Sequence, residues 1–351
     1  MAEQIKSDQV TPGQLKEILI LAIKNHLPLL IKGRPGIGKS DIVTQACQEA
    51  KARLVISHPV VSDPTDFKGL PYADRDGETA KFLPFGDLKE LINAQEETVF
   101  FLDDLGQAPA SVQAACMQLI LARRINGHKV SDKVTFLAAT NRREDKAGVM
   151  GILEPVKSRF ASIIELIPDS NEWRKWALSA ALPVELIAFI GFRPTLLDGF
   201  KATHDLINTP SPRTIHNIGK LMLAGTPKQL EFPLFSGAAG EGFSTEFLAF
   251  LKIFRNLPNP DMVLMSPQNA EIPTDPATLY ALCGALAARA SEQNFSRLIE
   301  YANRLSEEEH GGTKHGEFSL MLIADILQSK PELKNTKAFI DWSIKNQNLL
   351  I

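Results

Sequence analysis

The sequence predicts an α/β fold built on a parallel sheet, followed by a region that contains only helices. Three observations support this prediction. A glycine-rich loop joins an apolar run at residues 27–31 to a helical pattern at residues 40–47. Further apolar runs of strand length alternate with helical patterns as far as Pro168, which is typical of a parallel sheet. Beyond Pro168 the apolar residues recur only at helical spacing.

Composition limits the classes of protein to consider. The chain has 351 residues, of which 44% are hydrophobic and 23% charged, so it can form about two or three cores. A net charge of −3 gives no overall attraction to nucleic acid or to anionic membranes. No apolar run is long enough to span a membrane, and the first residues lack the apolar core of a signal peptide. Three widely separated cysteines, Cys47, Cys116 and Cys283, are expected to be reduced and buried in a cytoplasmic protein.

The glycine-rich loop carries the strongest chemical signal in the chain. Residues 33–40 follow the spacing G-x-x-x-x-G-K-S/T, which is typical of loops that bind the phosphates of a nucleotide. Glycine lets backbone N–H groups turn toward a polyphosphate, because no Cβ obstructs its approach. Lys39 would contact the β- and γ-phosphates, and Ser40 would bind a magnesium ion. The predicted nucleotide-binding residues of this segment are Gly33, Arg34, Pro35, Gly36, Ile37, Gly38, Lys39, Ser40 and Asp41.

The α/β domain can be followed along the chain by its local signals. Thr11, with a proline directly after it, predicts the start of a helix. Asp76 and Gly77 form a strong hairpin turn signal between two short extended runs. Five apolar runs are expected to form the parallel sheet: residues 27–31, 53–57, 98–102, 134–139 and 163–166.

Two acids and an amide follow neighbouring predicted strands. Asp103 and Asp104 come directly after residues 98–102, and Asn141 follows the strand at 134–139. Asp103 would hold a magnesium ion, and Asp104 would orient or deprotonate an attacking water. The amide of Asn141 could donate to the γ-phosphate or to that water. The alternative interpretation is a pair of solvated acids and an asparagine that begins a turn.

Two arginines could supply the positive charge that a transferring phosphoryl group requires. Arg159 precedes the last predicted strand, and Arg213 begins a helix in the helical region. A cation at a helix start is mildly unfavourable, so Arg213 calls for a compensating anion such as a bound phosphate. The alternatives are a surface salt bridge for Arg159 and an ordinary first-turn residue for Arg213.

The helical region has one predicted interruption. Residues 235–242 are rich in glycine and are expected to form a loop or linker. A helix is expected to begin at Ser211, and further amphipathic helices are expected at residues 245–255, 276–290, 294–305, 317–327 and 337–345.

Together these motifs resemble those of AAA+ ATPases of the MoxR-like group, over about residues 10–225. Residues 33–40 match the Walker A loop, and Asp103 with Asp104 matches Walker B. Asn141 matches sensor 1. Arg159, in the sequence Ser-Arg-Phe, matches the arginine finger that such proteins offer to a neighbouring subunit.

Further segments fit the same group. Arg213, in the sequence Ser-Pro-Arg, matches sensor 2 of a helical lid and is therefore a predicted nucleotide-binding residue. Residues 63–69 and the hairpin after them resemble the helix-2 insert, and Asn126 with Gly127 lies where the pre-sensor-1 hairpin belongs. The domains implied are an AAA+ nucleotide-binding α/β domain at 1–168, an α-helical lid at 169–230 and a C-terminal helical extension at 231–351.

The resemblance implies a fold order, an activity and an assembly. The parallel sheet would have strand order 5-1-4-3-2, and the activity would be hydrolysis of ATP with Mg²⁺. The protein would form a ring, expected to be a hexamer, in which Arg159 completes the site of a neighbour. The group often acts in chaperone-like remodelling or maturation, which makes a von Willebrand factor A-type protein a candidate partner.

The match departs from the group at one informative place. Its members usually read Asp-Glu-Ile-Asn-Arg-Ala-Pro after the Walker B strand, whereas residues 103–109 read Asp-Asp-Leu-Gly-Gln-Ala-Pro. Asp104 is one methylene shorter than the usual glutamate, so slower hydrolysis is expected. Gln107 replaces an arginine, which puts the inter-subunit contact of that residue in doubt.

Two other functions stay open at this point. A nucleotide-gated scaffold would bind ATP to assemble and hydrolyse little, and the short side chain of Asp104 motivates it. A nucleic-acid-associated NTPase would use the basic residues near the predicted turn, Arg123, Arg124 and Lys129, although the acidic net charge argues against it.

Overall fold

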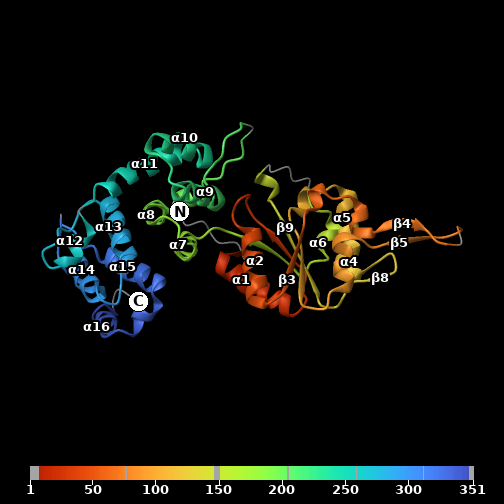
Figure 1. The fold of residues 1–351 in the computed structure, drawn as a ribbon, viewed down its shortest axis with the longest axis horizontal. Helices are drawn as coiled ribbons and strands as arrows, with labels where there is room; N and C mark the ends of the chain where they lie inside the picture. Colours follow the sequence, from red (N-terminus) through yellow and green to blue (C-terminus); the bar gives the residue numbers. More distant parts are fainter. Residues whose placement is uncertain are drawn as a thin grey trace. The chain divides into compact units, whose positions relative to one another are not determined.

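The chain divides into two compact units in a computed structural model. The model describes residues 8–75, 77–145, 151–203, 205–257, 259–310 and 312–347. The units are Met1–Asp169 with Phe200–His204, and Ser170–Gly199 with Asp205–Ile351. Figure 1 shows that the first contains a sheet with helices and that the second is built from helices.

The first unit is built on a parallel sheet of six strands, in the order β1-β10-β2-β9-β6-β3. The strands are β1 (Gln9–Val10), β2 (Leu29–Lys32), β3 (Arg53–Ser57), β6 (Thr98–Leu102), β9 (Val134–Thr140) and β10 (Ser162–Leu166). Five of them correspond to the predicted strands and have the predicted order 5-1-4-3-2, so this expectation is confirmed. The edge strand β1 was not predicted, because two residues are too few to show a periodicity.

Helices cover both faces of this sheet (Figure 1). They are α1 (Pro12–Lys24), α2 (Lys39–Ala50), α3 (Pro64–Lys68), α4 (Gly86–Asn93), α5 (Ala110–Ala122) and α6 (Glu154–Lys157). On one face α1 and α2 share an apolar cluster with Ile31, Phe101 and Leu137. On the other face α3, α4 and α5 pack with Phe100 and Phe136. Burial of alternate residues on opposite faces explains why the strands read as continuous apolar runs.

The helix start and the two turns predicted from local sequence are present in this unit wherever the structure describes them. Thr11 begins α1 in a capping box, in which its side chain accepts from the backbone of Gln14. Two antiparallel hairpins are present: β4 (Leu70–Ala73) with β5 (Ala80–Leu83), and β7 (Arg124–Ile125) with β8 (His128–Lys129). Asp76, in the turn predicted for the first hairpin, lies outside the described residues.

The two hairpins are tied to each other. Asn126, in the second predicted turn, donates from Nδ2 to the carbonyl oxygen of Lys68 over 2.7 Å. Nε2 of His128 lies 2.7 Å from the carbonyl oxygen of Phe82 in β5. Figure 1 shows the β4–β5 hairpin projecting beyond α5.

The second unit is helical, as expected after Pro168. Its helices are α7 (Ser170–Ser179), α8 (Val184–Phe192), α9 (Pro212–Leu223), α10 (Lys228–Ala239), α11 (Glu241–Arg255), α12 (Pro260–Met265), α13 (Pro276–Ala288), α14 (Phe295–Glu307), α15 (Gly316–Ser329) and α16 (Lys337–Lys345). One apolar cluster joins α7, α8 and α9 to α10, α11 and α13. The division into a lid and an extension at residue 230 remains a prediction.

The predicted linker at residues 235–242 is wrong. Helix α10 continues through Ala239 and α11 begins at Glu241, with Gly240 between them at a φ of +90°. Phe235 is fully buried and its ring packs at a tilt against that of Phe247, so apolar packing outweighs the low helix propensity of the glycines. Only the residue with positive φ breaks the helical path.

Two further predictions from the sequence concern the state of the cysteines and the lack of a membrane-spanning segment. Cys47, Cys116 and Cys283 are free and buried, as predicted. Burial raises the pKa of the Cys47 and Cys116 thiols to about 12. Within the part of the chain that the structure describes, no helix combines the length and apolar character needed to cross a bilayer.

Candidate nucleotide-binding site

The glycine-rich loop connects the end of β2 to the start of α2. Gly36 and Gly38 adopt positive φ angles of 74° and 102°, a region in which a side chain would be strained. The backbone N–H of Gly33 donates to the carbonyl oxygen of Thr140 over 3.2 Å, which ties the loop to the end of β9. The loop therefore turns at the carboxyl edge of the sheet, where open α/β sheets bind ligands.

Lys39 lies within this loop and is only 7% exposed. Its ammonium donates to the carbonyl oxygens of Gly33 and Arg34, each over 3.0 Å, and to Oδ1 of Asn141 over 2.8 Å. An anionic phosphate would be a stronger partner for this ammonium than these carbonyl and amide oxygens.

The predicted polar residues of β6 and β9 meet beside this lysine. Ser40 donates from Oγ to Oδ2 of Asp103 over 2.6 Å. The backbone N–H of Asp104 donates to Oδ1 of Asp103 over 3.1 Å, and Nδ2 of Asn141 donates to Oδ1 of Asp104 over 3.2 Å. With the Lys39–Asn141 bond, these contacts form one continuous chain, which we call the motif chain: Ser40, Asp103, Asp104, Asn141 and Lys39.

The geometry gives a physical reason for aspartate at position 104. Asp104 has φ 56° and ψ 34°, which is the left-handed region. Aspartate and asparagine enter this region more readily than longer side chains, so the backbone favours Asp over the glutamate usual in the resembling group.

Gly106 is a residue of this site that was not predicted from the sequence. A Cβ at Gly106 would lie 2.2 Å from Oγ1 of Thr140, the residue before Asn141. The close approach of this short turn to the end of β9 therefore requires glycine. Its signal was the glycine that replaces a larger residue of the resembling group.

Comparison with known proteins agrees with this geometry. Residues 29–167 match the family described as ATPase family associated with various cellular activities (AAA). The first unit therefore contains an AAA ATPase family domain, and we call this unit the AAA domain. The matched residues begin at β2 and end just after β10, so they enclose the whole motif chain. No curated protein sequence matches the chain.

Solved structures that resemble this chain include two of Thermotoga maritima RuvB. One, a point mutant, is 15% identical, with 78% of this chain and 80% of that chain covered and a TM-score of 0.40. The other, the Holliday junction branch migration motor, is 14% identical, covers 95% and 87%, and has a TM-score of 0.35. A putative ATPase from Cytophaga hutchinsonii is 13% identical, covers 95% and 87%, and has a TM-score of 0.34.

The two predicted arginines lie outside the motif chain. Arg159 follows α6 in the AAA domain, and its Nε is buried without a hydrogen-bond partner among the residues that the structure describes. Arg213 is exposed in the first turn of α9, which begins in a capping box of Ser211 and Thr214. Because Arg213 belongs to the second unit, its role at the nucleotide remains a prediction. Asp41 is exposed in the first turn of α2.

The donor set of the AAA domain fits magnesium. Ser40 Oγ and Asp103 Oδ2 are two hard oxygen atoms 2.6 Å apart at the end of the phosphate loop. Mg²⁺ is usually held by one or two protein oxygens, with phosphate and water oxygens completing its shell. Ser40 and Asp103 would therefore hold the ion, which would neutralise charge on the phosphates.

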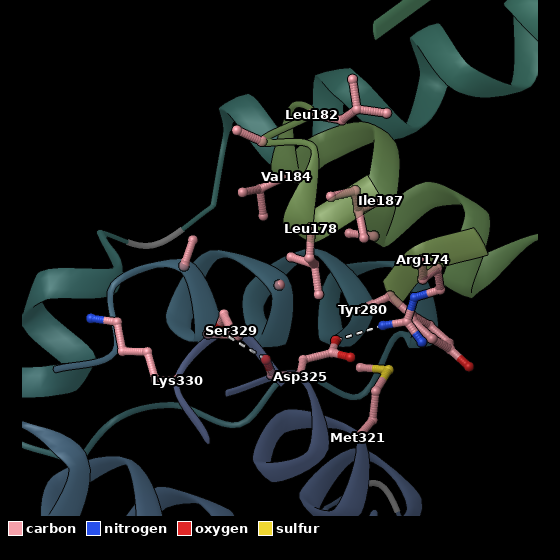
Figure 2. Close-up of a pocket in the computed structure, with 15 residues that line it drawn as sticks. Arg174, Leu178, Leu182, Val184, Ile187, Tyr280, Met321, Asp325, Ser329 and Lys330 are labelled. Carbon is pink, nitrogen blue, oxygen red and sulfur yellow. Dashed lines mark hydrogen bonds and ion pairs between the residues drawn. The ribbon is translucent and has the colours of Figure 1, made fainter. Parts of the chain in front are cut away.

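A cavity of about 320 Å³ lies within the second unit, among α7, α8, α13 and α15. Figure 2 shows Leu178 and Ile187 pointing toward it and the ion pair of Arg174 with Asp325 at one end. Nη2 of Arg174 lies 2.5 Å from Oδ2 of Asp325, and both side chains are nearly buried. Burial raises the pKa of Asp325, and Arg174 offsets part of that rise.

Proposed function

We propose that this protein is an ATP-hydrolysing AAA+ ATPase. The observation that supports this most is the motif chain, in which residues that follow β6 and β9 contact Lys39 and Ser40 at the start of α2. Phosphoryl transfer needs positioning and positive charge more than covalent chemistry. A buried ammonium, a carboxylate with a hydroxyl and an amide with a second carboxylate meet that need.

Each residue of the motif chain would have one task. Lys39 would exchange its carbonyl acceptors for phosphate oxygens and stabilise the charge that develops on them. Ser40 and Asp103 would hold Mg²⁺, which supplies charge neutralisation when it is bound. Asp104 would accept a hydrogen from the attacking water, and Asn141 would orient that water through its amide.

A ring assembly is part of the proposal. Arg159 would complete the site of a neighbouring subunit, which would give each site one residue from its neighbour. Its buried Nε, which has no hydrogen-bond partner in the described part of the chain, supports a role other than an internal salt bridge. We further propose membership of the MoxR-like group, a hexameric ring and chaperone-like maturation in the cytoplasm, with a von Willebrand factor A-type partner, on the resemblance of the motifs alone.

A nucleotide-gated scaffold is the second candidate function. The left-handed backbone of Asp104 favours the short carboxylate, which reaches less far toward a water than glutamate would. The nucleic-acid alternative loses support, because Arg123 donates to the carbonyl oxygens of Ser131 and Val134 and lies over the ring of Phe136. These contacts give Arg123 a structural task.

Phosphate release from Mg²⁺-ATP by two inactive variants tests the proposal. Lys39→Ala removes the phosphate contact and Arg159→Ala removes the neighbour's charge, so each alone should lose at least about a hundredfold in turnover. An equal mixture should regain roughly a quarter of the wild-type rate, because random rings contain sites with both residues intact. A wild-type rate in Arg159→Ala would refute the trans assignment. Nucleotide binding without turnover at any wild-type concentration would favour the scaffold.

A further inference from the structure

Six charged residues form a cluster beside the motif chain, and none of them belongs to a motif. They are Asp8, Lys32, Arg142, Glu144, Asp145 and Glu165, and we call them the charge cluster. Lys32 is the last residue of β2 and directly precedes Gly33 of the phosphate loop, while Arg142 directly follows Asn141. Two residues of the cluster are therefore direct sequence neighbours of residues in the two nucleotide motifs.

Arg142 makes the most specific contacts of the cluster. It donates from Nε to Oδ2 of Asp145 over 2.9 Å and from Nη2 to Oδ1 over 2.7 Å, a bidentate geometry. Its Nη1 donates to Oε1 of Glu165 over 3.2 Å. The side chains of Asp145 and Glu165 are only 5% and 6% exposed. The bond to Asp145 raises the pKa of the Arg142 guanidinium, so this arginine stays charged.

Glu165 links this arginine to the strand that carries the phosphate loop. Its Oε2 lies 3.4 Å from Nζ of Lys32, whose ammonium also donates to Oδ2 of Asp8 over 2.6 Å. In the sheet, Lys32 pairs with Glu165 on one side and with Thr140 on the other. Although burial alone lowers the pKa of Lys32, Asp8 and Glu165 raise it above its usual value. One buried carboxylate thus joins the ends of β2, β9 and β10.

Stability alone is a weak reason for such a cluster. A buried ion pair often contributes no more to folding than well-packed apolar residues would, because desolvation offsets the attraction. Charged groups do fix direction, since the guanidinium fork accepts only a narrow geometry. Here the residues whose direction is fixed are Arg142, which follows Asn141, and Lys32, which precedes Gly33.

We propose that the charge cluster positions the two nucleotide motifs relative to each other. Arg142 is a positioning residue for Asn141, Lys32 is a positioning residue for the phosphate loop, and Glu165 couples them. This inference rests on the proposed ATPase function. The two motifs would affect different kinetic constants, because Asn141 acts on the water or γ-phosphate of the reaction while the loop provides nucleotide affinity.

Steady-state ATP hydrolysis measures the two effects separately, as kcat and KM. Arg142→Ala should lower kcat at least about tenfold with KM changed by less than about threefold, whereas Lys32→Ala should mainly raise KM. Arg142→Lys should recover only part of kcat, because lysine lacks the fork. Arg143→Ala, at an exposed neighbouring position, is the matched control and should retain wild-type values. Binding stoichiometry of a fluorescent ATP analogue corrects each rate for the folded fraction.

A double variant distinguishes positioning from a structural role. If Arg142 acts through Asn141, then adding Arg142→Ala to Asn141→Ala should lower kcat little further, so that the two losses are not additive. Additive losses, or an unchanged kcat in Arg142→Ala, would overturn the inference. The proposed function would still hold in that case, provided that the wild type hydrolyses ATP. A wild type that neither binds nor hydrolyses ATP would overturn the proposed function, and this inference with it.

Discussion

The two units place charged groups in different surroundings. In the AAA domain, Lys39 lies at the start of α2, and Asp104 and Asn141 follow strands, where each is held by polar contacts that a ligand can replace. In the helical unit, Arg174 and Asp325 lie between packed helices and bond each other beside an apolar cavity. The first arrangement is suited to accepting a charged ligand, and the second is already neutral without one.

This difference follows from the elements that carry the residues. Loops at the carboxyl edge of a parallel sheet leave backbone N–H groups and short side chains available to a phosphate. Helix interiors satisfy their own backbone, so a buried charge there must find a side-chain partner on a neighbouring helix. The following predictions test whether the charges of the AAA domain act on a ligand and those of the helical unit act on stability.

The largest expected effect is on turnover in the AAA domain. Asp104→Asn keeps the size of the side chain and suits the left-handed backbone, but it removes the carboxylate that would accept a hydrogen from water. We expect kcat for ATP to fall about a hundredfold or more, with nucleotide affinity within about threefold of wild type. Phosphate release and equilibrium binding measure the two quantities. An unaltered kcat would remove Asp104 from the mechanism.

Arg174→Ala should act on stability in the helical unit. It leaves Asp325 nearly buried without its partner, so we expect a loss of about 2–4 kcal/mol in the free energy of unfolding at pH 7. Without the arginine, the pKa of Asp325 rises further above its unfolded value, so the folded state takes up the proton first as pH falls. The loss should therefore shrink at acidic pH and grow as pH rises.

Urea unfolding at several pH values measures that change. Arg53→Ala is the matched control, because the Arg53–Glu90 pair is about half exposed and should contribute less than about 1 kcal/mol. Equal losses in the two variants at pH 7 would show that the helical ion pair does not differ from a surface pair.

Gly106→Ala tests how tightly the AAA domain site is packed. The new Cβ would lie 2.2 Å from Oγ1 of Thr140, so we expect a loss of about 1–3 kcal/mol in stability. Adding Thr140→Ala removes that atom and should recover much of the loss. Thermal unfolding of the single and double variants provides the comparison, and purely additive losses would contradict the predicted contact.

The smallest expected effect concerns the cysteines, which lie in both units. Burial raises the pKa of Cys47 and Cys116 to about 12, and Cys283 is also buried. The thiolate is the reactive form, so the native protein should react slowly with a thiol reagent at pH 8. In guanidinium all three cysteines should react at once. Rapid native labelling of any of them would show local opening of its unit.

Much of the fold could be predicted because its signals are local. Continuous apolar runs identified the strands of a sheet covered on both faces. The glycine loop identified where the first of these strands ends and the following helix begins. The linker expected at residues 235–242 failed for the opposite reason. Burial of Phe235 is a tertiary effect that outweighs local glycine content.

The candidate site divides in the same way. Lys39 belongs to a recognisable glycine-loop motif, and Asp103 and Asn141 directly follow predicted strands, so their proximity was expected. Arg142 and Glu165 carry no such signal, because they meet only when the strands of the sheet are placed side by side. The close contact behind Gly106 is likewise visible only in three dimensions.

Nucleotide binding by Lys39→Ala tests the central claim most directly. With a fluorescent ATP analogue and Mg²⁺, wild type and the control Lys89→Ala, at an exposed position on α4, should bind alike. Lys39→Ala should weaken binding at least about tenfold, because the buried ammonium is lost from the phosphate loop. Equal affinity in all three proteins, or no binding by wild type, would contradict the account.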